Sequence, residues 1–181
     1  MDCRVLPLRQ LPHQPKLFLE YLDHFEKVKS FYAHPPAMQE VSRAARKLEY
    51  PEDRRVEVAS ILRKQNIALG AGAEAASNLD RLEKGAVAVV SGQQVGLFSG
   101  PAYAIYKALT AVQIAEELTR DGIPAVPVFW MATEDHDLDE VRHTTWLDQG
   151  KLIRFELPAP AESGRPVGRI PLGAQIEPLA Q

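Results

Sequence analysis

The sequence lacks several features that mark special classes of protein. It has one cysteine, Cys3, so a disulfide within the chain is excluded and Cys3 is expected to be a bystander. It has no apolar run near the ~20 residues that a membrane span needs, and no apolar signal-peptide core follows Met1. The net charge is -3 without a basic tail, which gives no support for nucleic-acid binding. These absences predict a cytoplasmic protein with no membrane or nucleic-acid partner.

Two short apolar runs, residues 86–90 and 125–131, lie on either side of a stretch with helical character, residues 103–120. Continuous apolar runs of this kind are typical of strands buried on both faces of a parallel sheet. Parallel strands require a long crossover, and Pro101 suits the first turn of the helix that would provide it. We therefore expect a βαβ unit over residues 85–142 and an α/β fold.

The chain before this unit is expected to be helical. Prolines make residues 1–16 extended, with a short edge strand as an option at Val5, Leu6 and Leu8. Apolar residues then recur at helical spacing between proline and glycine breaks. The expected helices span residues 17–33, 38–48, 52–69 and 73–84. Residues 1–84 are therefore expected to form an extended segment and helices that pack on the core.

The chain after the unit is expected to be rich in β structure. Residues 141–147 and 151–157 have strand character and flank a turn signal, which predicts a hairpin. Residues 167–172 predict one more short strand. Residues 143–181 would then begin a β-rich segment inserted after the second core strand. Because a parallel sheet with two strands needs more chain to cover it, we expect one truncated domain, either a fragment or the product of a truncated gene.

A glycine-rich bend, Ser91 to Pro101, follows the first apolar run. Glycines let backbone N–H groups approach a ligand, and the start of the following helix favours anions. The spacing matches neither the Rossmann G-x-G-x-x-G pattern nor a Walker A motif, so the glycines could instead serve only tight turns. Lys107 would reach a phosphate or a carboxylate, or would be a solvated helix lysine. The candidate substrate- or phosphate-binding residues are Ser91, Gly92, Gln93, Gln94, Gly96, Gly100, Tyr103 and Lys107.

An acidic bend follows the second apolar run. Five carboxylates surround His136, and they are Glu134, Asp135, Asp137, Asp139 and Glu140. Carboxylates so crowded must be solvated, paired, protonated or bound to a cation. They could act as a general base, hold a substrate amine or bind Mg²⁺, whereas zinc is disfavoured because the H-E-x-x-H spacing is absent. The alternative is an acid-rich helix N-terminus stabilised by the helix dipole.

Both bends follow strands that are expected to be parallel neighbours. Ligands of open parallel sheets bind beyond the carboxyl ends of the strands. We therefore expect the glutamine-bearing bend and the acidic bend to face one crevice.

The two bends together carry a resemblance to a known family. The run Val89 to Pro101 followed by Tyr103 and Ile105-Tyr106-Lys107, and the later run Pro127 to Glu140, resemble the bacillithiol biosynthesis family BshC. Two long motifs in the right order and at the right separation make the match specific. The resemblance covers essentially the whole chain, but only about the first third of a family member.

The resemblance implies a fold and an activity. BshC is the proposed cysteine ligase that adds L-cysteine to glucosaminyl-malate, the last step of bacillithiol assembly. Its Rossmann-like core is similar to the nucleotide-binding fold of class I aminoacyl-tRNA synthetases, with inserted segments and a C-terminal coiled coil that mediates homodimerisation. The implied mechanism is ATP-driven activation of the cysteine carboxylate, followed by attack of the glucosamine amine. ATP or ADP is thus an implied ligand, and a metal requirement is left open.

The resemblance also implies roles for individual residues. Gln93, Gln94, Lys107 and Glu134 would bind phosphate or substrate. The implied catalytic residues Asp135, His136 and Asp137 would position an amine or deprotonate it. One departure is that the first bend has no His-x-Gly-His sequence, the synthetase signature.

Two other classes of function remain open from the residues alone. They are a metal-dependent hydrolase that uses the acidic bend, and an inactive, truncated α/β binding module. Under the ligase interpretation, the isolated chain is expected to be inactive or poorly active, because the rest of the nucleotide site and the dimerising element would lie downstream.

Overall fold

The computed structural model describes residues 5–158 and 164–179, so Cys3 lies outside the described residues. Contacts between Cα atoms divide the chain into two compact units, Met1–Tyr50 and Pro51–Gln181. The division after residue 84 that the sequence suggested stays a prediction.

The first unit consists of short helices. Its elements are the 3-10 turn Leu8–Gln10, α1 (Lys16–Asp23), the 3-10 turn Phe25–Lys27 and α2 (Met38–Lys47). The helix expected over residues 17–33 is wrong in length, because the backbone leaves the helical region at His24. The bend sets the ring of Tyr21 5.9 Å from that of Phe25. The edge strand expected at Val5 to Leu8 is also wrong, since the 3-10 turn begins there.

The second unit begins with an antiparallel pair of helices, α3 (Glu52–Ala68) and α4 (Ala73–Glu83). Both helices were expected from the sequence. Leu79 and Leu82 of α4 pack with Ala86 and Val126, and Leu62 of α3 lies against this cluster. This apolar contact joins the helices to the sheet.

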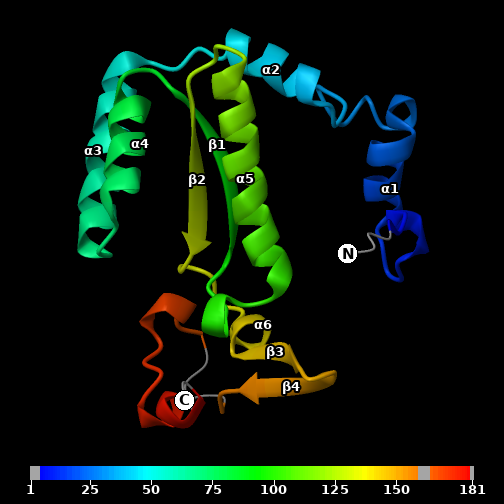
Figure 1. Cartoon of the computed structure of the whole chain (residues 1–181), viewed down its shortest axis with the longest axis vertical. Coiled ribbons are helices and arrows are strands. Elements are labelled where there is room, and N and C mark those ends of the chain that lie inside the picture. The colour runs from blue at the N-terminus through cyan, green and yellow to red at the C-terminus, as the bar shows by residue number, and fades with distance from the viewer. Residues whose placement is uncertain (1–4, 159–163, 180–181) are drawn as a thin grey trace. The chain divides into compact units, whose positions relative to one another are not determined.

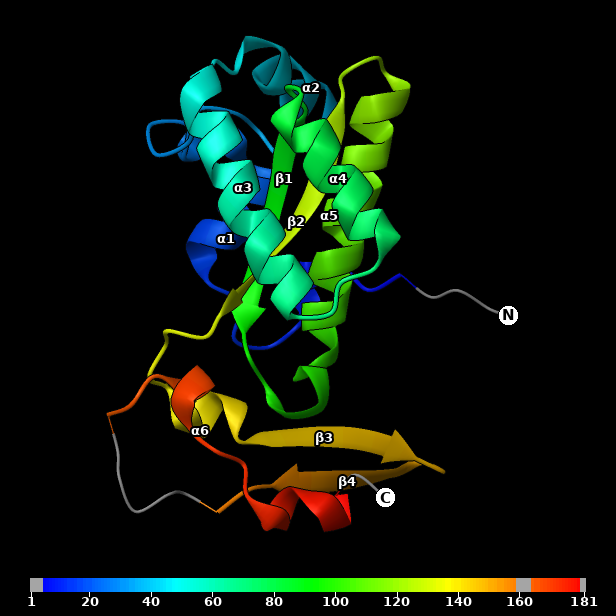
Figure 2. The same ribbon diagram turned by 90° about the vertical axis from the view of Figure 1, so that its left-hand side faces the viewer.

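The βαβ unit is confirmed. Strand β1 (Val87–Gln94) pairs in parallel with β2 (Ala125–Ala132), from Val87 opposite Ala125 to Gln94 opposite Ala132. Helix α5 (Ala102–Arg120) connects them and packs along both strands, and α4 contacts β2 (Figure 1 and Figure 2). Small residues make the close packing of α5 possible, and its buried positions are Ala104, Ala111, Ala115 and Leu118.

Two expectations about the strands are corrected. Residues 91–94 continue β1, so the predicted turn begins only after Gln94. Burial of both apolar runs on both faces is wrong, because Val90 is 63% exposed and Trp130 is 54% exposed. Leu79 and Leu82 of α4 pack against Ala86 and Val126 at the beginning of the sheet, and a groove of about 710 Å³ lies between α3, α4 and β2.

The predicted hairpin is confirmed, with β3 (His143–Asp148) antiparallel to β4 (Lys151–Glu156). The one-turn helix α6 (Leu138–Val141) precedes it. The strand expected over residues 167–172 is wrong, since a 3-10 turn spans Val167–Arg169. Backbone N–H groups of this segment bond to the region of the acidic bend and not to a neighbouring strand. Val167 N donates to Asp135 O at 2.7 Å, and Gly168 N donates to Thr133 O at 3.0 Å. A further 3-10 segment spans Ala174–Leu179. Across the described part of the chain, no helix is both long and apolar enough to cross a membrane.

Gly92 is required by the pairing of β1 with β2. A Cβ atom at this position would lie 2.8 Å from the backbone oxygen of Trp130 and 3.0 Å from its Cβ atom. Backbone atoms cannot move aside as the end of a flexible side chain can. Any other residue would therefore push the strands apart where they approach the candidate site.

We predict that Gly92→Ala lowers the free energy of unfolding by about 1–3 kcal/mol, the usual cost of overpacking. Urea unfolding measures this as a lower midpoint with an unchanged slope. Ser91→Ala in the same strand is the matched control and should change stability by no more than ~0.5 kcal/mol. Equal midpoints for Gly92→Ala and the wild-type chain would contradict the close approach.

Candidate functional site

The strand register brings the two polar bends together at one edge of the sheet. Gln94, the last residue of β1, lies opposite Ala132, and the acidic bend begins two residues later. Gln94 Nε2 donates a hydrogen bond to Asp135 Oδ2 at 2.9 Å. Side chains that are far apart in the sequence are thus in direct contact.

Gln93 connects three elements through its side-chain amide. Lys107 Nζ on α5 donates to Gln93 Oε1 at 2.8 Å. Gln93 Nε2 donates to Tyr103 Oη at 3.2 Å and to Glu140 Oε1 on α6 at 3.3 Å. Lys107 also donates to Gly92 O at 3.3 Å and lies 5.2 Å from the centre of the Tyr103 ring. Because the amide oxygen faces a cation and the amide nitrogen a carboxylate, the orientation of Gln93 is fixed.

The carboxylates of the acidic bend are partly occupied by local backbone groups. Asp135 Oδ1 accepts from the N–H of Asp137 at 2.9 Å. Asp137 in turn caps α6, with its Oδ1 accepting from Glu140 N at 3.1 Å. The alternative of an acid-rich helix N-terminus is therefore seen at Asp137, although α6 has only four residues. Asp137 remains exposed to solvent, whereas Asp135 is half-buried.

Hydrogen bonds hold the pKa of Asp135 below its ordinary value. The backbone N–H of Asp137 contributes most, the amide of Gln94 contributes next, and partial desolvation opposes both. Asp135 is consequently ionised at neutral pH. A carboxylate with a lowered pKa is a weaker base and a more reliable holder of a cation.

Glu134 lies apart from the glutamine cluster. His136 is exposed, next to Asp135 in the chain. Glu134 Oε1 accepts from Trp130 Nε1 at 3.3 Å and lines the groove between α3, α4 and β2. Gln93 and Gln94 instead line a cavity of about 310 Å³ beside α5. The structure therefore brings Asp135 to the glutamines and does not bring Glu134 there.

The remaining predicted residues have structural surroundings that account for them. Ser91 is half-buried within β1. A Cβ atom on Gly96 would lie 2.6 Å from the Cα atom of Gly100, so this pair must stay small. Between them, Phe98 and Ser99 have φ angles of 49° and 74°. Positive φ is uncommon outside glycine, so this bend has a tight backbone geometry.

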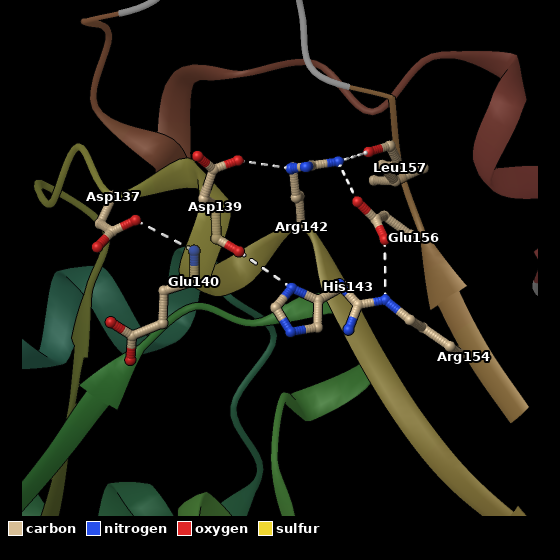
Figure 3. A network of polar contacts seen from close by, with 8 residues as sticks. All are labelled: Asp137, Asp139, Glu140, Arg142, His143, Arg154, Glu156 and Leu157. Atoms are coloured by element: carbon tan, nitrogen blue, oxygen red, sulfur yellow. Dashed lines mark hydrogen bonds and ion pairs between the residues drawn. The ribbon is translucent and has the colours of Figure 1, made fainter. Parts of the chain in front are cut away.

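Sequence reasoning missed the network that supports the acidic bend (Figure 3). Arg142 joins Asp139 to the end of β4 through Glu156 and the backbone oxygen of Leu157. His143 Nδ1 lies 3.0 Å from Asp139 O. The Asp139–Arg142 spacing of three residues was the available signal, because such pairs meet on one helix face.

The acidic residues do not converge on a common point. Among residues 5–158 and 164–179, no group of three or more His, Cys, Asp and Glu side chains is placed to hold a metal ion. Each carboxylate of the bend instead has a partner of its own, as the contacts above show.

We predict that Gln94→Leu raises the pKa of Asp135, but not fully to its ordinary value, because the Asp137 N–H remains. Carboxyl-carbon NMR titration measures this directly. Tyr103→Phe is the control, because it removes a hydrogen-bonding group of the same cluster that does not contact Asp135. A carboxyl group whose pKa is lowered in the folded state stabilises the fold at pH values above its ordinary pKa. This stabilisation is lost as the pH falls through the lowered pKa. The stability difference between Gln94→Leu and wild type should accordingly narrow in acid, and an unchanged pKa in Gln94→Leu would refute the assignment.

Comparisons with known proteins agree with the motifs. A family model described as "Bacillithiol biosynthesis BshC, N-terminal Rossmann-like domain" matches residues 1–181. A Koribacter versatilis protein named "Putative cysteine ligase BshC" is 43% identical over 182 residues, covering 99% of this chain and 34% of that protein. A Solibacter usitatus protein of the same name is 41% identical over 180 residues, covering 98% and 33%.

The chain therefore spans about a third of the length of these relatives. The resemblance carried by the two bends is confirmed, and the α/β fold is confirmed as Rossmann-like. The chain belongs to the bacillithiol biosynthesis BshC family, whose N-terminal Rossmann-like domain it carries.

Proposed function

We propose that this chain supplies one wall of the active site of a cysteine ligase that joins L-cysteine to glucosaminyl-malate. The observation that carries the proposal is the direct contact between the two family motifs. Gln94 bonds to Asp135, and Gln93 bonds to Glu140 and Lys107. The chain covers about a third of its relatives, so the activity is that of the longer protein.

The charges of the site suit an amine. Asp135 and Glu140 each bond to one of the glutamines, whereas the ammonium of Lys107 is already bonded to Gln93 Oε1 and Gly92 O. A site with an excess of carboxylates attracts an ammonium group and repels an anion. Asp135, which stays ionised, would hold the ammonium form of the substrate amine.

His136 would accept the proton that the amine must lose. An amine attacks a carboxyl carbon only through a free electron pair, so the held ammonium group must first be deprotonated. Imidazole is the side chain that most often serves as a general base in enzymes, and His136 is exposed and next to Asp135 in the chain. The free amine then forms the new carbon–nitrogen bond as the bond between the carboxyl carbon and the activating group breaks, and the second proton of the nitrogen passes to water.

ATP would supply the activation of the cysteine carboxylate. The residues around the first bend do not provide the cations that a triphosphate needs, because Lys107 of α5 is bonded to Gln93 Oε1 and Gly92 O and two carboxylates, Asp135 and Glu140, bond to the glutamines. The likeness of the core to class I aminoacyl-tRNA synthetases is part of the proposal, and the parallel βαβ unit with polar groups at its strand ends supports it.

The proposal extends to the surroundings of the site. We place the β3–β4 hairpin as an insertion after the second core strand, and the full-length protein as a cytoplasmic homodimer. The metal-dependent hydrolase has no support from the relatives, since those named above are called cysteine ligases. No contact in the described residues favours an inactive binding module over the ligase.

We predict that Asp135→Asn and His136→Ala, each in the full-length protein, reduce cysteine addition. Loss of a general base costs typically 10²–10⁴-fold in rate, so His136→Ala should act mainly on kcat. Asp135→Asn should act mainly on the KM of the substrate whose amine is held. Chromatographic detection of bacillithiol from L-cysteine and glucosaminyl-malate measures both. Asp148→Asn, an exposed position in the hairpin, is the matched control, and wild-type rates in both site variants would exclude the assignment.

We also predict that the 181-residue chain alone adds cysteine at less than a tenth of the full-length rate, on the order of one unit of log kcat or more. Its bends supply the amine side of the site and lack the cations for nucleotide binding. The same assay at equal molar concentrations decides this, and full turnover by the isolated chain would contradict it.

A further inference from the structure

We propose that Arg142 is a positioning residue of this site. It ties the one-turn helix α6 to the β3–β4 hairpin and thereby holds Glu140 against the amide of Gln93. What the held groups do rests on the proposed function. The positioning itself rests on contacts that can be measured without any activity.

The guanidinium of Arg142 bridges two elements (Figure 3). Its Nε donates to Asp139 Oδ1 on α6 at 2.8 Å. Its Nη1 donates to Leu157 O at 2.9 Å and pairs with the carboxylate of Glu156, both at the end of β4. The backbone adds a tie in the opposite direction, since Leu157 N donates to Arg142 O at 2.9 Å. The planar guanidinium suits such multiple contacts, which a lysine ammonium cannot reproduce.

Helix α6 needs an external anchor. It has four residues, far fewer than the ~12–15 at which an isolated helix becomes even marginally stable in water. Asp137 caps its first turn, and Val141 is its buried residue. Arg142 directly follows the helix and ties it to the end of β4, in addition to the contact of His143 Nδ1 of β3 with Asp139 O.

The position of α6 decides how Gln93 is oriented. Glu140 Oε1 accepts from Gln93 Nε2 at 3.3 Å, near the upper limit of a hydrogen bond. A small displacement of α6 would break this contact, although Lys107 would still bond to Gln93 Oε1. The amide would then keep its partner on α5 and lose its partner on α6. The effect of Arg142 therefore reaches the site through Glu140.

Arg154 offers a matched control within the same network. Its Nε donates to Glu156 Oε2 at 2.9 Å, so it shares a partner with Arg142. The contacts that define Arg154 lie within β4 and do not include α6. Arg142→Gln and Arg154→Gln thus each remove a guanidinium group from the Glu156 carboxylate, and only Arg142→Gln also breaks a contact with α6.

The first experiment follows the 181-residue chain by NMR. In Arg142→Gln, the backbone N–H of Glu140 should exchange with solvent at least tenfold faster, and the side-chain amide signals of Gln93 should shift. In Arg154→Gln, the exchange rate of the Glu140 N–H and the Gln93 amide signals should stay as in the wild-type chain. The exchange rates of backbone amides in the β1–β2 ladder should be unchanged in either variant. Unchanged Glu140 and Gln93 signals would overturn the proposal. Equally faster exchange of the amides throughout the β1–β2 ladder would also overturn the proposal, because it indicates general destabilisation. If Arg142→Gln does not fold, the milder change Glu156→Gln repeats the test.

The second experiment measures cysteine addition by the full-length protein. Misplacing a substrate-contacting group by about 1 Å costs up to ~10²-fold in rate, so Arg142→Gln should lower kcat/KM by a factor in that range. Arg142→Lys should restore little of it, and Arg154→Gln should match wild type. Because Arg142 acts through Gln93, Arg142→Gln combined with Gln93→Leu should lose no more than Gln93→Leu alone. If the losses of kcat/KM in the two single variants multiply in the double variant, Arg142 does not act through Gln93.

The two experiments separate two kinds of failure. If the wild-type full-length protein adds no cysteine, the proposed function is wrong, and the NMR comparison alone decides whether Arg142 positions α6. If cysteine addition is present and Arg142→Gln leaves both kcat and KM unchanged, the positioning role is wrong and the proposed function stands.

Discussion

The parallel pairing of β1 with β2 is the constraint on which the site depends. The ladder runs to Gln94 opposite Ala132, and the two polar bends therefore leave the sheet at the same edge. Gly92 permits this pairing because the backbone of Trp130 occupies the space of a side chain. If the pairing of β1 with β2 ended before Gln94, the side chain of Gln94 would not be held beside Asp135. The site is thus a consequence of strand register more than of any single polar residue.

The acidic bend combines structural and chemical demands. Its backbone donors bind its own carboxylates, which lowers the pKa of Asp135 and caps α6 through Asp137. Its carbonyls at Thr133 and Asp135 accept the N–H groups of Gly168 and Val167. The bend is therefore held from both sides while its carboxylates remain ionised. A fixed group of negative charges can bind an ammonium without reorganising, and such preorganisation is what electrostatic catalysis requires.

The sequence predicts the elements whose patterns are long, and it fails where tertiary contacts decide. The βαβ unit, α3, α4 and the hairpin have clear periodicity and breakers, and each is present. The helix expected over residues 17–33 stops at Asp23, where the chain turns Phe25 onto Tyr21. Residues 167–172 have strand composition, but their backbone donors pair with the acidic bend. No local pattern carries that information.

The candidate site shows the same division. The contact of Gln94 with Asp135 follows from two adjacent parallel strands, and the sequence was sufficient to predict that the bends meet. Glu134 was grouped with them by proximity in the sequence, yet it lines the groove beside α3 and α4. Arg142 was not singled out, because its partners Glu156 and Leu157 come from a strand 14 or 15 residues away. Side-chain direction within a bend is set by such contacts.

A double-mutant cycle on kcat/KM for cysteine addition tests the union of the two bends most directly. It compares Gln94→Leu, Asp135→Asn and their combination in the full-length protein. If the bends form one site, the effects are coupled by about 0.5–3 kcal/mol, the range for residues in contact. Additive effects, with a coupling energy of zero within error, would contradict a shared site.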